Sequence, residues 1–505
     1  MSLSPPRFNL SALFLALLAF HALGQEPKPV TTPPPPAKEP PKSEEKAPSL
    51  PADAHVSQTI ECDGKTLAYT ATVGTLPVYD TAGKRSGEVV YTAYTVEGAN
   101  RPVTFALNGG PGASSVYLNL GAIGPKRIRF GEQGDSPSDP VTLRDNPGTW
   151  LDFSDLVFID PVGAGFSRSL VSPDESKKQF FSTEADIQYL SRIIYDWLVK
   201  NGRLSSRKYL VGESYGGYRG PRITHFLQSQ LGVAMNGVVL VSPYLNPTLS
   251  ENSEVSPVPW MLTLPSIAAA HLERNHELTA ANMAKVIAYT QGEYVTDLLK
   301  GPADPQATAR LVKQVTAMTG LQEGFVRRSG GRLEIGAYLR EVFREQGKLG
   351  SVYDSNVTSW DPFPFAPDQR FSDPLLESII APTTTAMVDF VTRVVGWKTD
   401  ARYHALSYDV NRQWDRDSRP LRMGAVSDLR QAVAADPKLR VVIAHGWNDL
   451  SCPFMGSILT VEQMPPMGDA TRVAVHEYPG GHMFYNRSDS SAALRKDVRE
   501  MVAKH

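Results

Sequence analysis

Six short apolar runs, separated by longer segments, constrain the fold of this chain more than any other feature. Each is four to six residues long and rich in aliphatic side chains, as buried strands of a parallel sheet are. Repetition of strand, helix and strand predicts an α/β fold with a mostly parallel central sheet. The runs occupy residues 103–108, 156–160, 208–211, 238–242, 440–445 and 472–476.

The segment 182–202 predicts a helix between two of these strands. Thr183 and Asp186 suit a capping box at its start, and Gly202 is a suitable terminator. The apolar positions that fall on one helical face are Ile187, Leu190, Ile194 and Trp197.

Two further regions complete the predicted organisation. Residues 56–96 alternate apolar and polar side chains with glycine-bearing turns, which is typical of antiparallel strands. Residues 250–404 carry helical patterns and several prolines, which predicts a mainly helical cap over the C-terminal edge of the sheet, or else a structural lobe far from the site. The core is thus expected in two parts, 55–249 and 405–505, with the helical cap insertion between them.

The N-terminus is interpreted as an export signal. The apolar run 10–23 follows Arg7 and is short for a membrane span, and Ala22 and Gly24 are the small residues expected before a cleavage site at Gln25. Residues 1–24 are therefore predicted to be a signal peptide, with an uncleaved anchor as the alternative. Residues 25–54 are proline-rich and charged, and are expected to form a disordered tether. The expected location is secreted or periplasmic, without stable membrane insertion after the signal is removed.

Composition excludes several classes of protein. The 505 residues carry a formal net charge of −2, which argues against a nucleic-acid binder. The two cysteines, Cys62 and Cys452, allow one disulfide at most, and no Cys/His set has zinc spacing. No metal or organic cofactor is expected, and the sequence does not decide the oligomeric state.

Ser214 is the candidate nucleophile. It lies in "GESYG", a G-x-S-x-G motif directly after the strand at 208–211 and before a possible helix that contains Pro221. Strand, sharp turn and helix are what expose a serine hydroxyl in α/β-hydrolases. The motif alone is a weak signal, since glycine and serine are common in turns.

A serine nucleophile needs a base and a carboxylate to orient that base. Asp449 follows the strand at 440–445, and His482 lies beyond a glycine-rich turn after the strand at 472–476, in the order serine, acid, histidine of these hydrolases. Both loops are at the sheet edge that gathers catalytic groups. The competing residues are His445, His476 and Asp489.

The glycine-rich stretch "LNGGPGASS" at 107–115 follows a strand and could offer backbone N–H groups to an oxyanion. Together with "GESYG", the aspartate loop, "GHM" at 481–483 and "FIDPVGAGFSRS" at 158–169, it resembles the serine carboxypeptidase family. The resemblance implies an α/β-hydrolase fold with a helical insertion. It also implies an enzyme that removes single residues from peptide or protein C-termini, and the scarcity of cysteines favours a bacterial-type member.

Position by position, the resemblance assigns Ser214 as nucleophile, His482 as general base and Asp449 as its orienting acid. Gly110 and Tyr215 would supply the oxyanion-hole N–H groups. The residues matched to substrate binding are Asn108, Gly109 and Glu213.

Glu213 would bind the substrate's terminal carboxylate only as a neutral acid, because two carboxylates repel each other. Burial raises the pKa of a carboxyl, so a protonated Glu213 could donate a hydrogen bond, and peptidase activity is expected to favour acidic pH. The alternative is that Glu213 only braces the turn.

The sequence also departs from the family pattern. Ala122 stands where many members carry a second glutamate, Ala113 and Ala106 replace a usual cysteine and tryptophan, and "MFY" follows the histidine. These departures weaken the expectation of a two-carboxyl recognition site. An esterase or acyltransferase on the same fold is therefore the first alternative, and a catalytically silent tethered binding protein is the second.

Overall fold

The computed structural model describes residues 49–129, 137–250, 255–366, 373–415 and 420–504. The predicted signal peptide and most of the predicted tether lie outside these residues. The end of the tether segment already belongs to the folded unit, since Asp53 accepts hydrogen bonds from Lys200 at 2.6 Å and Tyr91 at 3.1 Å.

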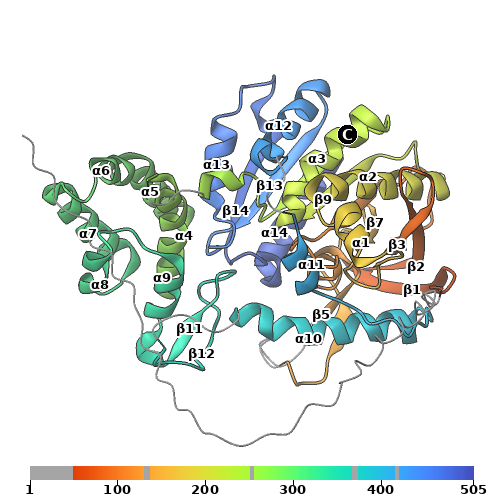
Figure 1. Ribbon diagram of the computed structural model, residues 1–505, viewed down its shortest axis with the longest axis horizontal. Helices are drawn as coiled ribbons and strands as arrows, with labels where there is room; N and C mark the ends of the chain where they lie inside the picture. Colours follow the sequence, from red (N-terminus) through yellow and green to blue (C-terminus); the bar gives the residue numbers. More distant parts are fainter. Residues whose placement is uncertain (1–48, 130–136, 251–254, 367–372, 416–419, 505) are drawn as a thin grey trace, which may run out of the picture. The chain divides into compact units, whose positions relative to one another are not determined.

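One large sheet organises the chain, in the strand order β1-β2-β3-β7-β4-β9-β10-β13-β14, with β8 paired to β3 (Figure 1). The pairs from β1 to β7 are antiparallel, and those from β7 to β14 are parallel. The strands are β1 (Ala54–Cys62), β2 (Lys65–Tyr79), β3 (Arg85–Thr95), β4 (Val103–Leu107), β7 (Asp155–Ile159), β8 (Arg168–Ser169), β9 (Lys208–Glu213), β10 (Gly237–Val241), β13 (Arg440–Gly446) and β14 (Val473–Tyr478).

The predicted α/β-hydrolase class is confirmed. Each of the six apolar runs forms a strand of the parallel part, and 56–96 supplies the antiparallel strands. The predicted helix is α2 (Thr183–Lys200), but its start was predicted one residue too late. Ser182 is the N-cap and accepts from the Ala185 amide, while Asp186 turns inward to bind Arg219.

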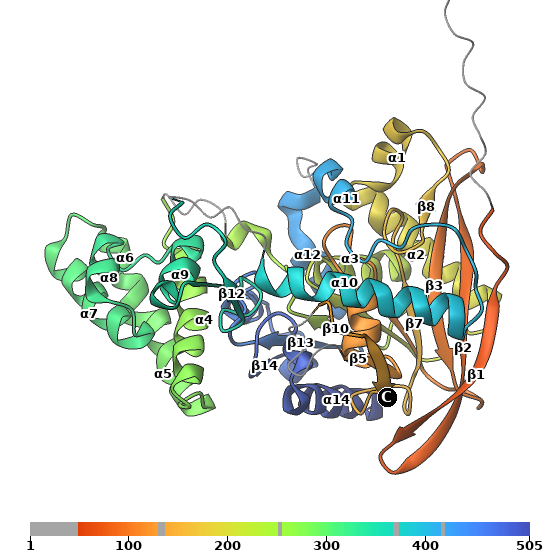
Figure 2. The same ribbon diagram turned by 90° about the horizontal axis from the view of Figure 1, so that it is seen from below.

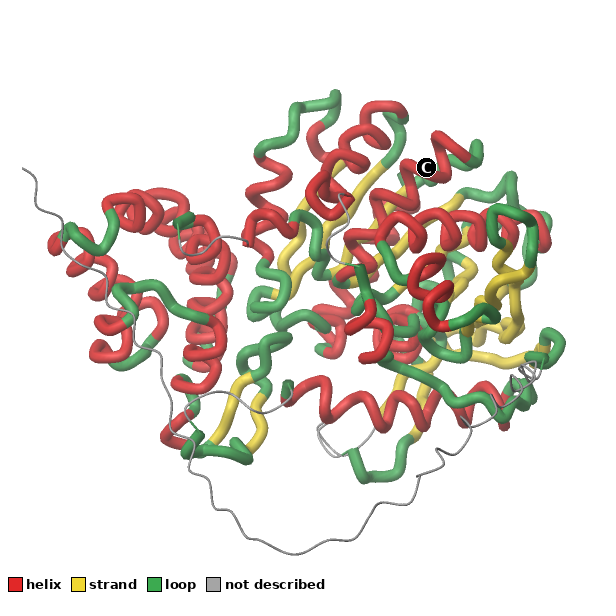
Figure 3. Tube along the Cα trace, viewed as in Figure 1, coloured by secondary structure: helices red, strands yellow, loops and turns green. Residues whose placement is uncertain are grey.

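The α-helices of the described residues are α1 (Pro173–Phe180), α2, α3 (Tyr215–Gln230), α4 (Val258–Arg274), α5 (Ala280–Tyr289), α6 (Val295–Lys300), α7 (Pro305–Thr319), α8 (Glu323–Arg328), α9 (Ile335–Glu341), α10 (Pro374–Asp389), α11 (Tyr408–Gln413), α12 (Pro420–Ala435), α13 (Phe454–Glu462) and α14 (Ser488–Ala503). Helices α2, α3 and α12 pack on one face of this sheet and α10 and α14 on the other, while the helices between residues 258 and 341 form a separate group (Figure 3). Within the described ranges, no helix is both long enough and apolar enough to cross a bilayer.

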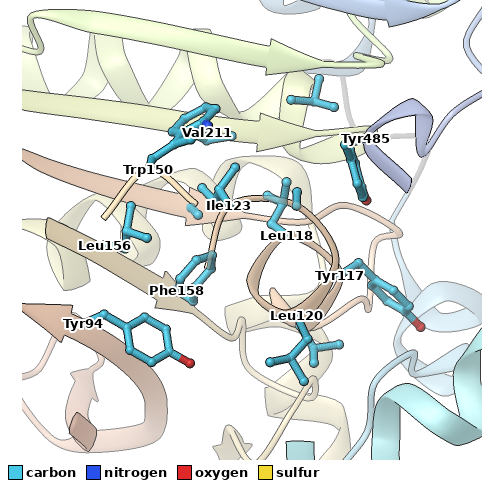
Figure 4. Close-up of a cluster of buried hydrophobic side chains, with 14 of the residues drawn as sticks. Tyr94, Tyr117, Leu118, Leu120, Ile123, Trp150, Leu156, Phe158, Val211 and Tyr485 are labelled. Carbon is cyan, nitrogen blue, oxygen red and sulfur yellow. The ribbon is translucent and has the colours of Figure 1, made fainter. Parts of the chain in front are cut away.

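Two hydrophobic cores form against the sheet. One joins the sheet to α2, α3 and α12. The other joins it to α14, to α10 and to a π-helical turn at Leu118–Ile123 (Figure 4). Alternation of side chains across a strand is what divides the apolar residues between the two cores.

The segment 255–404 consists of two parts that differ in packing. Helices α4 to α9 share a core of their own, to which Leu450 of the main fold contributes. Helix α10 instead packs through Ala386 and Met387 into the core on the sheet, beside β5 (Lys126–Arg129) (Figure 2). Between the parts lies a short hairpin of β11 (Lys348–Gly350) and β12 (Thr358–Trp360), and β5 pairs with β6 (Thr142–Asp145).

Replacement of Leu190 by alanine tests the packing of α2 on the sheet. Leu190 is fully buried, so Leu190→Ala removes apolar contacts and leaves a cavity, and we expect the free energy of unfolding to fall by about 2–5 kcal/mol. Gln188→Ala on the exposed face of the same helix should change it by less than about 0.5 kcal/mol. Equal effects of the two changes in chemical denaturation would contradict the packing described.

Candidate active site

Ser214 occupies a sharp turn between β9 and α3. Its backbone has φ 60° and ψ −122°, a conformation that L-residues rarely adopt. Three hydrogen bonds hold it: the Ser214 amide donates to Val241 at 3.0 Å, and its carbonyl accepts from Gly217 at 2.8 Å and Tyr244 at 3.0 Å. The side chain therefore projects from the C-terminal edge of the sheet, as in a nucleophile elbow.

The glycines around Ser214 are required by close backbone contacts. A Cβ at Gly212 would overlap the carbonyl oxygen of Gly216, and one at Gly216 would overlap that of Leu107. A Cβ at Gly217 would overlap Pro243. The turn and the adjacent strand ends thus fit only without these side chains.

Asp449 and His482 meet at the same edge of the sheet, because each follows the end of a parallel strand, β13 or β14. His482 Nδ1 lies 2.7 Å from Asp449 Oδ2, and both residues are buried. Asp449 Oδ1 accepts from the amides of Ser451 at 2.8 Å and Cys452 at 2.9 Å. A proton on Nδ1, bonded to Asp449, leaves Nε2 as the basic nitrogen of the ring.

The environment of His482 favours its charged form. Burial alone would lower the pKa of His482, but the Asp449 carboxylate, with a further contribution from Cys452, outweighs burial and raises it well above its ordinary value. The backbone is held on both sides, since the His482 amide donates to Tyr353 at 2.5 Å and its carbonyl accepts from Ser242 at 2.8 Å. The Tyr353 ring packs edge-on against the imidazole at 5.1 Å.

The competing residues are engaged elsewhere. His445 is buried with Nε2 at 2.8 Å from Ser457 Oγ, and burial lowers its pKa to about 4. His476 faces Asp497 at 3.2 Å, and Asp489 is exposed in the first turn of α14. The structure therefore brings only His482, of these histidines, to Asp449 as a hydrogen-bond partner within the described residues.

The glycine-rich loop lies against the start of α3. A Cβ at Gly109 would come within 2.5 Å of the Tyr215 amide nitrogen. Neither the Gly110 nor the Tyr215 N–H donates to an acceptor in the part of the chain that the structure describes. Tyr215 is also the first residue of its helix, where the dipole favours negative charge. Both amides are thus available to an oxyanion.

Glu213 ends strand β9 beside the candidate nucleophile and is 2% exposed. Its Oε2 accepts from the Tyr485 hydroxyl at 2.8 Å, and Asn108 also hydrogen-bonds to the carboxyl. Burial raises the pKa of Glu213 to about 7, although the charge of His482 and these two donors oppose the rise. Glu213 is thus able to exist as a neutral acid near neutral pH.

A buried ion pair lies beneath the turn and was not predicted from the sequence. Arg219 and Asp186 are both fully buried and meet at 2.6 Å, and Arg219 Nη1 donates to the Asn108 carbonyl at 2.6 Å. The guanidinium also lies 4.8 Å from the centre of the Tyr215 ring. The Arg219 side chain of α3 therefore connects α2, the glycine-rich loop and Tyr215. The spacing of 33 residues between the pair leaves no local pattern to find.

Two tyrosines near Glu213 were also missed. Tyr485, which donates to Glu213, is 1% exposed and lies three residues after His482. Tyr117 is buried, its hydroxyl has no hydrogen-bond partner among the described residues, and Glu213 contributes to the raised pKa of its phenol. Only the departure of "MFY" from the family pattern pointed to one of them.

Glu273 of the cap contacts both the loop that carries Asp449 and the loop that carries His482. Arg487, shortly after His482, bonds to Glu273 of α4 and lies 2.9 Å from Asp354. Glu273 Oε2 also accepts from Asn448 Nδ2 at 2.5 Å, directly before Asp449. Helix α4 therefore contacts the loops of Asp449 and His482 through a hydrogen-bonded network.

The cysteines do not pair. Cys62 and Cys452 are both free and buried. Asp449, Cys452 and His482 place one ligand atom each within 4.8 Å, as a metal site would. The hydrogen bond of His482 Nδ1 to Asp449, and of Asp449 to two amides, accounts for the cluster without a metal.

A cavity of about 230 Å³ lies between the loops that follow β10 and β13 and the cap. Its walls are mainly apolar, which suits a bulky apolar group of a ligand. The wall residues include Tyr244, Leu245 and Leu249 after β10, Leu450 and Cys452 after β13, and Trp260 and Leu333 of the cap.

Comparison with known proteins identifies relatives of this chain. Serine carboxypeptidase-like 36 of Arabidopsis thaliana is 30% identical over 183 residues, which are 34% of this chain and 35% of that protein. Pheromone-processing carboxypeptidase kex1 of Schizosaccharomyces pombe is 29% identical over 142 residues, 28% of this chain and 25% of that protein. These matches span only about a third or less of the relatives' length.

Among solved structures, the Kex1 prohormone-processing carboxypeptidase of Saccharomyces cerevisiae shares the fold. The TM-score is 0.53 at 15% identity, with 85% of this chain and 91% of that chain covered. The family model described as serine carboxypeptidase matches residues 83–338, just over half of the sequence. This chain belongs to the serine carboxypeptidase family.

Proposed function

We propose that this protein is an exported serine carboxypeptidase that hydrolyses the last peptide bond of peptide or protein C-termini. The observation that carries the proposal is the Asp449–His482 pair at the sheet edge that also bears Ser214. Glu213, buried directly before Ser214, adds a group able to recognise a terminal carboxylate.

In the proposed acylation, Ser214 Oγ attacks the carbonyl carbon of the scissile bond and gives its proton to His482 Nε2. The carbonyl oxygen becomes an oxyanion between the N–H groups of Gly110 and Tyr215. The C–N bond then breaks as His482 passes the proton to the departing amine. The products are an acyl-enzyme ester on Ser214 and the free C-terminal residue.

In the proposed deacylation, water takes the place of the released residue. The water gives a proton to His482 while its oxygen bonds to the acyl carbon, and the carbonyl oxygen becomes an oxyanion for a second time. The ester bond to Ser214 breaks, and the serine regains its proton from the imidazolium. Asp449 stabilises that imidazolium in both halves, which fits the raised pKa of His482.

Glu213 is proposed to select substrates with a free C-terminus. As a neutral acid it donates a hydrogen bond to the terminal carboxylate, with Asn108 and Gly109 lining the same position. As an anion it repels that carboxylate. The apolar cavity beside the acid loop is proposed to hold a bulky side chain of the substrate.

An esterase or acyltransferase remains the second candidate, and Ala122 is the observation that favours it. A buried apolar side chain stands where the family pattern has a second carboxyl, so recognition of a free C-terminus depends on fewer groups. Retention of all three triad residues argues against the catalytically silent binding protein.

Ser214→Ala tests the nucleophile. We expect release of the C-terminal residue from a blocked dipeptide to fall by at least about a thousandfold, because no other group can form the acyl-enzyme. Ser229→Ala, at an exposed site on the same helix, should keep wild-type activity. Residual turnover above about a tenth of wild type in Ser214→Ala would contradict the proposed mechanism.

Asp449→Asn tests the orienting acid. The amide oxygen can still accept from Ser451 and Cys452, so the loop should fold normally. The amide no longer stabilises the imidazolium or its productive tautomer, and we expect kcat to fall by about ten-thousandfold. Unchanged kcat with an unchanged unfolding midpoint would remove Asp449 from the triad.

The pH dependence of substrate choice tests Glu213. Its pKa of about 7 means that the neutral acid predominates below pH 7 and the carboxylate above it. The ratio of kcat/KM for a blocked dipeptide acid to that for its C-terminal amide should therefore fall as pH rises, mostly within about one unit of pH 7. Protonation of His482 slows both substrates equally at every pH and therefore cancels in the ratio of the two kcat/KM values. The acidic preference is proposed for this ratio.

Glu213→Gln is the control for this titration. Glutamine cannot ionise, so the ratio should become nearly independent of pH. A ratio that still falls near neutral pH in this variant would assign the titration to another group.

A further inference from the structure

The contact between Tyr485 and Glu213 has no counterpart in the mechanism above. Tyr485 lies in the 3-10 turn Phe484–Asn486, in the loop that also carries His482. Its hydroxyl donates to Glu213 Oε2 at 2.8 Å from a fully buried position. Burial and the neighbouring Glu213 raise the pKa of this phenol well above its ordinary value, so Tyr485 remains a donor throughout the working range of pH.

The ring of Tyr485 fits against the turn that carries Ala122. A Cβ at Gly121 would come within 3.3 Å of Tyr485 Cε2, so the ring uses the space that a glycine leaves. Tyr485 and Leu118 of the turn belong to the same buried cluster and come from different segments of the chain (Figure 4). The turn of Tyr485 is in turn fixed by Arg127, which donates to the Tyr485 carbonyl at 3.1 Å.

The hydrogen bond also determines where Glu213 can carry its proton. When Oε2 accepts from Tyr485, the proton of the neutral acid resides on Oε1, and its O–H is the donor left for a ligand. A carboxyl without such a partner could present either oxygen and rotate about its last torsion. Tyr485 thus orients Glu213 together with Asn108, and its bond to Oε2 favours Oε1 as the protonated oxygen.

We propose that Tyr485 is the positioning residue of the carboxylate-binding site, with its hydroxyl beside Glu213 in the role that a second carboxyl would otherwise have. This inference rests on the carboxypeptidase activity proposed above. It explains two departures from the family pattern together. Ala122 offers no polar group to Glu213, and Tyr485, in the altered segment after His482, supplies one.

The test compares Tyr485→Phe with a matched control in the full chain. Tyr478 is also buried and donates to a carboxylate, Asp497 at 2.6 Å, and its ring stacks on Phe484, yet no contact joins it to Glu213 among the described residues. Tyr478→Phe therefore removes an equivalent hydrogen bond at a neighbouring place. Both variants are assayed on the dipeptide acid and on its amide across the pH range.

For Tyr485→Phe we expect KM for the acid to rise about tenfold, with KM for the amide unchanged. Loss of a donor to the ionised Glu213 should also move the midpoint of the acid-to-amide ratio upward by about one pH unit. Tyr478→Phe should keep the wild-type KM and midpoint. Equal loss on both substrates, or an unchanged midpoint, would overturn the positioning role.

A second variant keeps the proposal testable if Tyr485→Phe fails to fold. Gly121→Ala keeps the hydroxyl but presses its new Cβ on the ring, and should shift the midpoint in the same direction by a smaller amount. A wild-type midpoint in folded Gly121→Ala would contradict the proposal.

The two levels of inference fail differently. Wild-type protein that cleaves neither peptide overturns the proposed function, and the positioning role with it. Ser214-dependent cleavage of the acid by wild type, with Tyr485→Phe equal to Tyr478→Phe, overturns only the positioning role.

Discussion

The backbone of Ser214, held in a rarely populated conformation, is the constraint on which the rest of the site depends. Its hydrogen bonds run to Val241 at the end of β10, to Gly217 in α3 and to Tyr244 after β10. The ends of β4 and β9 pack closely against the same turn. The cost of such a conformation is of the order of 1–3 kcal/mol, and it persists only because its surroundings permit no alternative. The glycines at 212, 216 and 217 are therefore structural requirements of the Ser214 turn.

The local patterns of the sequence predict the parallel strands, the helix at α2 and the loops that bear Asp449 and His482. These features depend on apolar runs and glycine turns that a reader can find within a few residues. The Arg219–Asp186 pair, the Tyr485–Glu213 contact and the packing of α10 on the sheet depend on residues far apart in the chain. These contacts depend on tertiary packing, which no periodic pattern in the sequence indicates.

The N-cap of α2 illustrates a smaller difference. Both Ser182 and Thr183 are good capping residues, and the sequence favours the one followed by an acid three positions later. The acid, Asp186, instead forms a buried ion pair with Arg219 of α3. Asp186 could cap the start of α2 or pair with Arg219. It pairs with Arg219, which is buried, because an unpaired charge there would cost the most free energy.

Glu273 gives the cap a role that its place in the chain conceals. Its carboxylate accepts a hydrogen bond from Asn448, which directly precedes Asp449. It also forms an ion pair with Arg487, which lies five residues after His482. A cap exchanged between two members of this fold would bring a different group to that position and leave two loops without their shared partner. The insertion is thus not a separable module. A recombinant that exchanged it would also have to exchange Asn448 and Arg487, so changes in the cap are coupled to changes in the loops that carry Asp449 and His482.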